Sequence, residues 1–214
     1  MRFVSLMSGG IDSPTATHIM LGRGHEAFIL NMDNDPFLGP EELRKVERLA
    51  RRLAELHPGR VRLFRAPHGI DLAAFKDKSN LRYTCILCKR AMLRVADILC
   101  DRVGAEIIVM GDSMGQVASQ TLYNMAAVSR GTRHPIVRPL IGFDKLDIEH
   151  ISREAGLFEI SIGKTEGGCL AVPRYPIISA ESARLEQEAE KADLENTVKK
   201  VAEGIREIDF NLNY

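Results

Sequence analysis

The stretch VSLMSGGIDSPTA, residues 4–16, decides the fold. Its apolar first residues predict a short buried strand, and the two glycines that follow predict a tight turn. Ser13 and Pro14 then predict a helix that begins with a serine cap and has proline at its first position. Such a unit directs unpaired backbone N–H groups and the positive end of a helix dipole at one point. The stretch therefore predicts a cradle for phosphate.

Apolar runs and helical patterns alternate along the chain after this stretch. Strands are predicted at residues 2–6, 27–31, 61–65, 106–111 and 136–140. Helices are predicted at 14–22, 41–56 and 144–155, with one more beginning near Cys85 and another after Gly115. This order predicts the α/β class with a doubly wound, mostly parallel sheet, in which ligands bind at the carboxyl ends of the strands.

The composition changes near Ile178, where Ala, Glu, Lys and Leu become frequent. Apolar residues then recur at steps of four and three, at Leu194, Val198, Val201, Ile205 and Ile208. This spacing predicts an amphipathic C-terminal helix that packs on its own domain or contacts a partner or a second copy in a homodimer. We therefore expect one α/β domain over residues 1–177 and a helical extension over residues 178–214.

The chain has 214 residues, 45% of them hydrophobic, and a formal net charge of zero. These values suffice for one buried core, and they leave any nucleic-acid contact to a local patch. No apolar run is long enough to cross a membrane, so we expect a cytoplasmic protein without a membrane partner. In that compartment the four cysteines favour metal or sulfur chemistry over disulfides.

The motif SGGIDS, residues 8–13, is not a Walker A loop because no Gly-Lys-Ser/Thr follows it. It resembles the SGGxDS signature of the PP-loop ATP pyrophosphatases. Three longer strings are similar to the PP-loop domain of the ThiI family, the tRNA 4-thiouridine synthetases: GDSMGQVASQTLYNMAAVS (111–129), RPLIGFDKLDIEHISREAGLFEIS (138–161) and GGCLAVPRYP (167–176). The resemblance covers most of residues 1–177. It implies an adenine nucleotide alpha hydrolase-like fold and an ATP-dependent sulfurtransferase that adenylates the C4 oxygen of a uridine in tRNA and replaces AMP with sulfur.

The resemblance also implies roles for particular residues. The loop would bind pyrophosphate through Ser8, Gly9, Gly10, Ile11, Asp12 and Ser13. Within it, Asp12 would place Mg²⁺ or orient the loop. The strand end FILNMD, residues 28–33, would hold adenine through the backbone and through Met32, for which a core methionine is the alternative. The turn Gly111-Asp112-Ser113 would face the α-phosphate, followed on a helix by Gln116, Ser119 and Gln120. Cations that would stabilise the reacting phosphate are Lys89, Arg138 and Lys145, for which a solvated surface position is the alternative.

The cysteines bear on the sulfur chemistry. Cys85 and Cys88 form a C-x-x-C at a predicted helix start, where the helix dipole favours thiolate, and Cys169 lies in GGCLAVP, where the ThiI family has a cysteine that can carry sulfur. Together the three would hold a 4Fe–4S cluster with one open iron that supplies sulfide. Zinc on the three thiolates is one alternative, and a persulfide on Cys169 that Cys85 or Cys88 resolves is another. Cys100 is expected to be a core thiol.

The sequence departs from the ThiI pattern, which normally includes a ferredoxin-like region and a THUMP domain and, in some bacteria, a rhodanese domain. We therefore expect a stand-alone form in which tRNA binds directly or is presented by a separate THUMP-domain protein, with sulfide or a persulfide as the donor. Residues 44–65 carry a local excess of positive charge, which would face RNA or, as the alternative, only solvent. The cations are Arg44, Lys45, Arg48, Arg51, Arg52, Arg60, Arg62 and Arg65, against the carboxylates of Glu47 and Glu55. The alternative functions are a PP-loop enzyme that thiolates or amidates a small molecule and a non-catalytic nucleotide-binding subunit.

Overall fold

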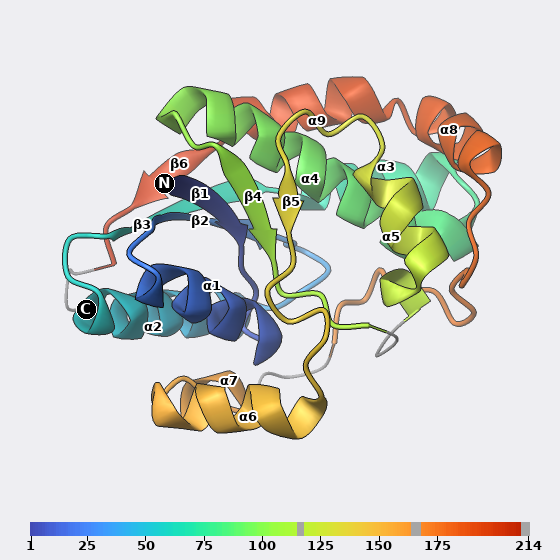
Figure 1. Ribbon diagram of the computed structural model, residues 1–214. Helices are drawn as coiled ribbons and strands as arrows, with labels where there is room; N and C mark the ends of the chain where they lie inside the picture. The colour runs from blue at the N-terminus through green and yellow to red at the C-terminus, as the bar shows by residue number, and fades with distance from the viewer. Residues whose placement is uncertain (115–117, 164–167, 211–214) are drawn as a thin grey trace.

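The computed structural model describes residues 1–114, 118–163 and 168–210, so the predicted helix start after Gly115 and the candidate Gln116 lie outside the described residues. A six-stranded sheet with the order β5-β4-β1-β2-β3-β6 forms the centre of the molecule (Figure 1). Its strands are β1 (Arg2–Leu6), β2 (Glu26–Asp33), β3 (Val61–Pro67), β4 (Ile107–Met110), β5 (Ile136–Val137) and β6 (Arg206–Ile208). Every pairing is parallel except that of β6 with β3. This confirms the predicted doubly wound, mostly parallel sheet.

Helices cover both faces of the sheet (Figure 1). One face carries α1 (Asp12–Gly22), α2 (Pro40–Leu56), α6 (Lys145–Glu154) and α7 (Phe158–Ser161). The other carries α3 (Gly69–Lys78), α4 (Thr84–Val103), α5 (Leu122–Ser129), α8 (Ser182–Lys191) and α9 (Leu194–Glu203). Two short 3-10 turns lie at Leu81–Tyr83 and Ala118–Gln120. None of these described helices combines the length and apolar character that crossing a bilayer requires.

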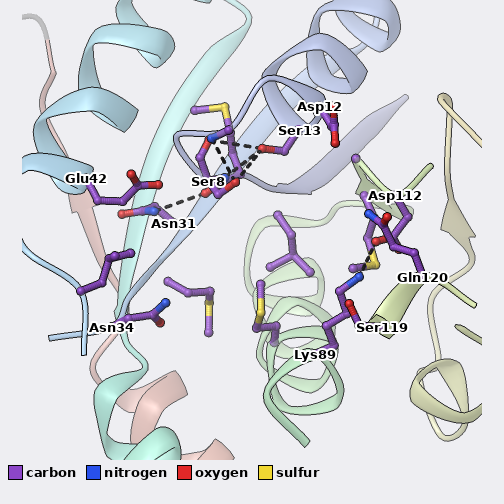
Figure 2. Close-up of a pocket in the computed structure, with 18 residues that line it drawn as sticks. Ser8, Asp12, Ser13, Asn31, Asn34, Glu42, Lys89, Asp112, Ser119 and Gln120 are labelled. Atoms are coloured by element: carbon purple, nitrogen blue, oxygen red, sulfur yellow. Dashed lines mark hydrogen bonds and ion pairs between the residues drawn. The ribbon is translucent and has the colours of Figure 1, made fainter. Parts of the chain in front are cut away.

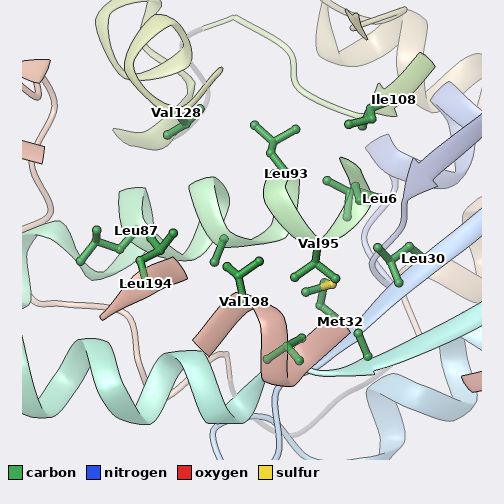
Figure 3. Close-up of a cluster of buried hydrophobic side chains, with 14 of the residues drawn as sticks. Leu6, Leu30, Met32, Leu87, Leu93, Val95, Ile108, Val128, Leu194 and Val198 are labelled. Carbon is green, nitrogen blue, oxygen red and sulfur yellow. The ribbon is translucent and has the colours of Figure 1, made fainter. Parts of the chain in front are cut away.

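The strands are apolar on both faces because each face is covered by helices. Alternate residues enter opposite cores: Phe3 and Ile29 pack toward α1 and α2, while Val4 and Leu30 pack toward α4. The second of these cores includes Val198 of α9, beside Leu93 and Val95 of α4 (Figure 3). The C-terminal segment is therefore part of the same hydrophobic core as the parallel sheet.

Strand β1 lies at the point where the order in which strands are added to the sheet changes direction. The chain adds β2 and β3 on one side of β1, then returns to add β4 and β5 on the other side. The connections that leave β1 and β4 therefore diverge at their carboxyl ends, which opens a crevice in sheets of this type. The glycine loop follows β1, and the turn at Gly111 follows β4, so both border this crevice.

The start of α1 differs from the prediction. The helix begins at Asp12, with Ile11 as its N-cap in a helical conformation and no side-chain capping bond, so the predicted cap at Ser13 is wrong. Ser13 Oγ instead accepts a hydrogen bond from the Ser8 N–H at 3.0 Å. Pro14 is tolerated in the first turn because backbone N–H groups there have no partner within the helix.

The C-terminal segment also differs from the single predicted helix. It forms two helices, α8 and α9, and then the edge strand β6. The predicted apolar steps hold through Val201 on α9, but Ile208 lies on β6. The helix ends at Glu203, and Gly204, its C-cap, passes so close to β3 that a Cβ there would lie 2.6 Å from Cγ of Pro67.

Candidate active site

A cavity of about 270 Å³ opens at the carboxyl ends of β1, β2 and β4 (Figure 2). The glycine loop lines it with Ser8, Gly10, Asp12 and Ser13. The other walls come from the end of β2, the start of α2, α4 and the segment after β4. Their lining residues include Asn31, Met32, Asn34, Glu42, Lys89, Met92, Gly111, Asp112, Ser119 and Gln120. The fold thus gathers around one cavity most of the residues that the resemblance assigned to nucleotide.

The glycine loop is shaped by its own hydrogen bonds. Ser13 Oγ accepts from the Ser8 N–H and donates to the Ser8 carbonyl at 3.2 Å, while Ser8 Oγ accepts from the Gly10 N–H at 3.4 Å. The Gly9 N–H donates to Glu42 Oε1 at 2.6 Å, and Glu42 lines the cavity. A carboxylate oxygen of Glu42 thus already accepts a hydrogen bond from the Gly9 N–H, which is the interaction that a phosphate oxygen would make.

Gly111 allows the turn after β4 to touch the glycine loop. A Cβ at this position would lie 2.5 Å from both the N and the Cα of Ser13 and 2.8 Å from the carbonyl carbon of Asp12. All of these are backbone atoms, so no side-chain movement could relieve the clash. Glycine is therefore required here by close backbone approach rather than by a positive φ.

Asp112 binds two of the predicted phosphate cations. Lys89 Nζ lies 2.6 Å from its Oδ1 and Arg138 Nε lies 3.1 Å from its Oδ2, and the Asp112 side chain is 6% exposed. Arg138 also donates to Ser129 Oγ at 3.0 Å. The third cation, Lys145 at the start of α6, pairs with Asp12 Oδ1 at 3.1 Å. Lys89 lines the cavity, whereas Arg138 and Lys145 pair with the carboxylates of Asp112 and Asp12, which line it.

Several buried polar atoms near the crevice have no hydrogen-bond partner among the described residues. They are Asn31 Oδ1, Asn34 Oδ1, Gln120 Oε1 and Ser113 Oγ. Unpaired buried polar atoms are costly, so groups of this kind in a cavity indicate a polar ligand. Adenine carries both an amine donor and ring-nitrogen acceptors. The residues present therefore fit ATP.

The fold also brings Cys85, Cys88 and Cys169 near one another. Cys88 lies close enough to the other two thiols that its charge raises the pKa of each. Burial raises the pKa of Cys85 to about 11, and the proximity of the other two thiols adds to this rise. Burial likewise raises the pKa of Cys169. The predicted lowering at the helix start is therefore wrong for Cys85, because burial disfavours its thiolate. Cys100 is fully buried in the core, as expected.

His68 was not identified from the sequence, yet it contacts Cys88. His68 Nε2 lies 3.1 Å from Cys88 Sγ, and His68 Nδ1 lies 3.0 Å from Asp71 Oδ2. Burial alone would lower the pKa of His68, but the neighbouring Cys88 and Asp71 raise it to about 10. The available signal was APHGID, residues 66–71, in which His and Asp stand three apart directly after a strand.

The described side chains form no metal-binding group, so the metal site suggested by the cysteines stays a prediction. Across the described residues, no group of three or more His, Cys, Asp or Glu side chains is placed to hold a metal ion. Cys88 Sγ is engaged by an imidazole nitrogen instead. Neither a three-cysteine iron–sulfur cluster nor a three-thiolate zinc site is therefore supported by the arrangement of these side chains.

The basic residues between positions 44 and 65 do not form one open surface. Arg65 is 9% exposed and pairs with Glu47 at 2.8 Å, and Arg62 pairs with Glu207 at 2.6 Å. Lys45 is buried and donates to the Ser161 carbonyl, while Arg51 and Arg52 donate to the carbonyls of Phe210 and Ala155. Most of these cations therefore hold other described segments in place, and a direct RNA contact by this stripe stays a prediction.

Comparisons with known proteins agree with this geometry. A "probable tRNA sulfurtransferase" of Methanothermobacter thermautotrophicus is 39% identical over 203 residues, which are 94% of this chain and 51% of that protein. One of Thermococcus kodakarensis is 40% identical over 181 residues, which are 83% and 46% of the two chains. The chain thus spans about half the length of the curated relatives it matches.

Solved structures show the same relation. A 4-thiouridine synthetase in complex with RNA and ATP superposes with a TM-score of 0.91 at 30% identity, over 97% of this chain and 55% of that one. An NMN synthetase from Francisella tularensis, at 12% identity and a TM-score of 0.59, shares the fold alone. The family model "Thiamine biosynthesis protein (ThiI)" matches residues 1–194. The chain therefore belongs to the ThiI family.

Proposed function

We propose that this chain is the ATP-using part of a tRNA sulfurtransferase, which adenylates the C4 oxygen of a uridine in tRNA and replaces the adenylate with sulfur. The observation that carries the proposal is the superposition of nearly the whole chain on a 4-thiouridine synthetase that binds RNA and ATP. The cavity at the carboxyl edge of the sheet supports it, because its glycine loop and unpaired polar atoms suit a nucleotide.

In this proposal the phosphates of ATP bind at the glycine loop, Ser8 to Ser13, where the Gly9 N–H exchanges the Glu42 carboxylate for a phosphate oxygen. Adenine lies against Met32 and Asn31 at the end of β2. Asp12 would hold Mg²⁺, which would neutralise phosphate charge, and Lys145 sits beside it. The turn at Gly111 to Ser113 faces the α-phosphate, and Gln120 closes that side of the cavity.

The chemistry requires activation of a poor leaving group. A uracil carbonyl oxygen does not leave readily, whereas an adenylate does, so transfer of AMP to the oxygen precedes attack by sulfur. Negative charge grows on the phosphate during this transfer, and fixed cations stabilise it. Lys89 and Arg138 are held near the cavity by Asp112, so they are oriented before the nucleotide binds. We infer that Asp112 positions both cations.

The sulfur step is assigned to Cys85, Cys88 and Cys169, with a persulfide or sulfide as the donor. The thiols themselves are the carriers in this proposal, and a 4Fe–4S cluster held by the same three cysteines is the alternative. Residues 1–177 would carry the chemistry, while the extension from residue 178 completes the core. Binding of tRNA by this chain alone, by a homodimer or through a separate THUMP-domain protein belongs to the same proposal.

The experiment combines the chain with ATP, Mg²⁺, a persulfide donor and unmodified tRNA under anaerobic conditions, followed by mass spectrometry of the digested nucleosides. We expect 4-thiouridine that depends on ATP and is lost in Asp12→Asn. Gly22→Ala, at the far end of the same helix and without contacts within 4 Å, is the matched control and should retain activity. ATP turnover without thiolated nucleoside, with or without an added THUMP-domain protein, would instead support a small-molecule substrate.

A further inference from the structure

A second cavity, of about 270 Å³, lies at the carboxyl edge of the sheet, on the other side of β2 from the nucleotide cavity. Its walls are Asp33 at the end of β2, Arg65 and Pro67 at the end of β3, Gly204 after α9 and Arg206 on β6. Among the described residues that line the two cavities, none belongs to both. The proposed chemistry therefore leaves this second cavity without a role.

The register of two strands places two arginines side by side in this cavity. Arg65 on β3 pairs directly with Arg206 on β6 in the antiparallel ladder. The Cβ atoms of such a pair lie about 4.5–5.5 Å apart on one face of the sheet, and like charges placed opposite each other destabilise the pair. Arg65 shares its face with Leu63, which packs in the core beneath α2. A single anion bound between the two guanidinium groups would relieve their repulsion.

Arg65 is buried and only partly paired. Its side chain is 9% exposed, and Nη2 donates to Glu47 Oε1 at 2.8 Å. The buried Nε has no hydrogen-bond partner among the described residues. A buried donor on a charged group is costly to leave unpaired, and the planar guanidinium is suited to several oxygens of one anion. The unpaired Nε of a residue that lines the cavity therefore indicates an oxygen-bearing anion.

Arg206 supplies the second positive charge. Its side chain is exposed and forms no ion pair within the described part of the chain. The carboxylate of the next residue, Glu207, is paired at 2.6 Å with Arg62, which lies on the opposite face of the sheet over the ring of Phe64. The carboxylate that does line the cavity is Asp33, and its Oδ1 already accepts from a backbone N–H at 3.2 Å. Two cations and one carboxylate therefore face the cavity.

The carbonyl groups at the end of α9, which lies beside the cavity, are already bonded. The Gly204 N–H donates to the Val201 carbonyl at 3.1 Å. The Ala202 carbonyl accepts from the Ile205 N–H at 3.3 Å and from Arg102 Nη2 at 2.9 Å. Because the negative end of a helix dipole resides on unpaired carbonyls, this helix end adds little negative charge to the cavity.

A polar row on this face leads from the arginine pair to the nucleotide cavity. Arg65 is the register partner of Asn31 on β2 as well as of Arg206 on β6. Asn31 lines the nucleotide cavity, and its Oδ1 is unpaired among the described residues. The arginine pair is therefore a neighbour of the nucleotide cavity at the carboxyl edge, where ligands bind in sheets of this type.

We propose that Arg65 and Arg206 form a phosphate-binding site that is separate from the glycine loop. The phosphate oxygens accept from Arg65 Nε and from the Arg206 guanidinium, while Glu47 keeps Arg65 Nη2. Arginine suits this role because its planar guanidinium matches the geometry of phosphate oxygens and stays charged. The phosphate has two sources, the backbone of an RNA or a free anion such as inorganic phosphate or pyrophosphate. Only the RNA source rests on the proposed function.

The test follows the Arg65 Nε–H resonance by heteronuclear NMR of the full chain, with chloride adjusted to keep the ionic strength constant. Inorganic phosphate should shift this resonance to saturation, and phosphate bound at the glycine loop does not interfere because the probe belongs to this cavity. Arg206→Ala should weaken the binding about tenfold, the loss expected for one charge-assisted contact. Arg62→Ala is the matched control, since it removes a guanidinium from the same strand pair on the opposite face, and should bind phosphate unchanged.

A change of opposite sign separates binding from a structural role. Asp33→Asn removes the carboxylate that lines the cavity but keeps an oxygen for the Asp35 N–H, so phosphate should bind about threefold more tightly. Arginines that only held the strands together would show no such gain. The same resonance distinguishes the two sources. Saturation by a short single-stranded RNA at a lower concentration than by inorganic phosphate or pyrophosphate identifies the RNA backbone, and the reverse order identifies a free anion.

Two results would overturn the inference: an Arg65 Nε–H resonance that phosphate, pyrophosphate and RNA all leave unmoved, or phosphate binding that Arg206→Ala leaves unchanged. The outcome is separable from that of the proposed function. Phosphate binding at Arg65 without thiolation of tRNA would count against the function alone. Thiolation of tRNA by a chain whose Arg65 resonance does not respond to any of these anions would count against this inference alone.

Discussion

Gly111→Ala should disable the nucleotide site while leaving the fold intact. The new Cβ would lie 2.5 Å from N and Cα of Ser13, about 0.9 Å closer than the 3.4 Å at which ordinary contact begins. Because both atoms belong to the backbone, the glycine loop itself must move by about this amount. Introducing a methyl into such a contact costs about 1–3 kcal/mol. A displacement near 1 Å of groups that position a substrate costs about 100-fold in rate.

Two measurements separate these effects. Thermal unfolding should report a loss of about 1–3 kcal/mol for Gly111→Ala, and calorimetry with ATP and Mg²⁺ should report a loss of binding well beyond that expected from partial unfolding. Gly22→Ala on α1 is the matched control, because a Cβ there has no neighbour within 4 Å. If Gly111→Ala binds ATP as the unmodified protein does, the contact between the turn and the loop does not shape the site.

Three further changes probe other contacts. Asp112→Asn removes the partner of two cations and should lower the free energy of unfolding by about 3 kcal/mol in chemical denaturation; an unchanged midpoint would contradict the pairing. Glu42→Gln should tighten ATP binding about tenfold, or about 1.4 kcal/mol, because a neutral amide oxygen competes less strongly than a carboxylate with phosphate for the Gly9 N–H; calorimetry tests this, and equal affinity would show no competition. Burial lowers the pKa values of His18 and His57, so the folded state binds protons there less readily than the unfolded state does. The free energy of unfolding should therefore be highest above pH 6.5 and should decline as the pH falls below it. Thermal melts across this range check the decline, which His57→Gln should reduce.

The parallel core was predictable because its signals are local. The run from Val4 to Pro14 combines a strand, a glycine turn and a helix start within eleven residues, and the strands are apolar enough to be recognised individually. Strand β6 was not predicted, since it has only three residues and two of them are exposed. Its pairing with β3 arises from tertiary packing after α9 ends, so no pattern within residues 206–208 indicates it.

The site was predictable only in part, for a similar reason. Asp12 and Asp112 stand in recognisable motifs, but the partners that hold them come from distant segments, and Lys145 meets Asp12 across 133 positions. The contact between His68 and Cys88 depends on how α3 packs against α4, which the sequence does not state. A buried histidine after a strand looks like any polar residue in a turn until its two neighbours are known.

Helix α4 connects the nucleotide cavity with the thiols of Cys85 and Cys88, which it carries. Cys88 and Lys89 are consecutive residues, and because each residue of an α-helix turns by about 100°, their side chains leave the helix in different directions. One meets His68 and the other meets Asp112. These two consecutive side chains therefore belong to different sites, Lys89 to the nucleotide cavity and Cys88 to the thiols.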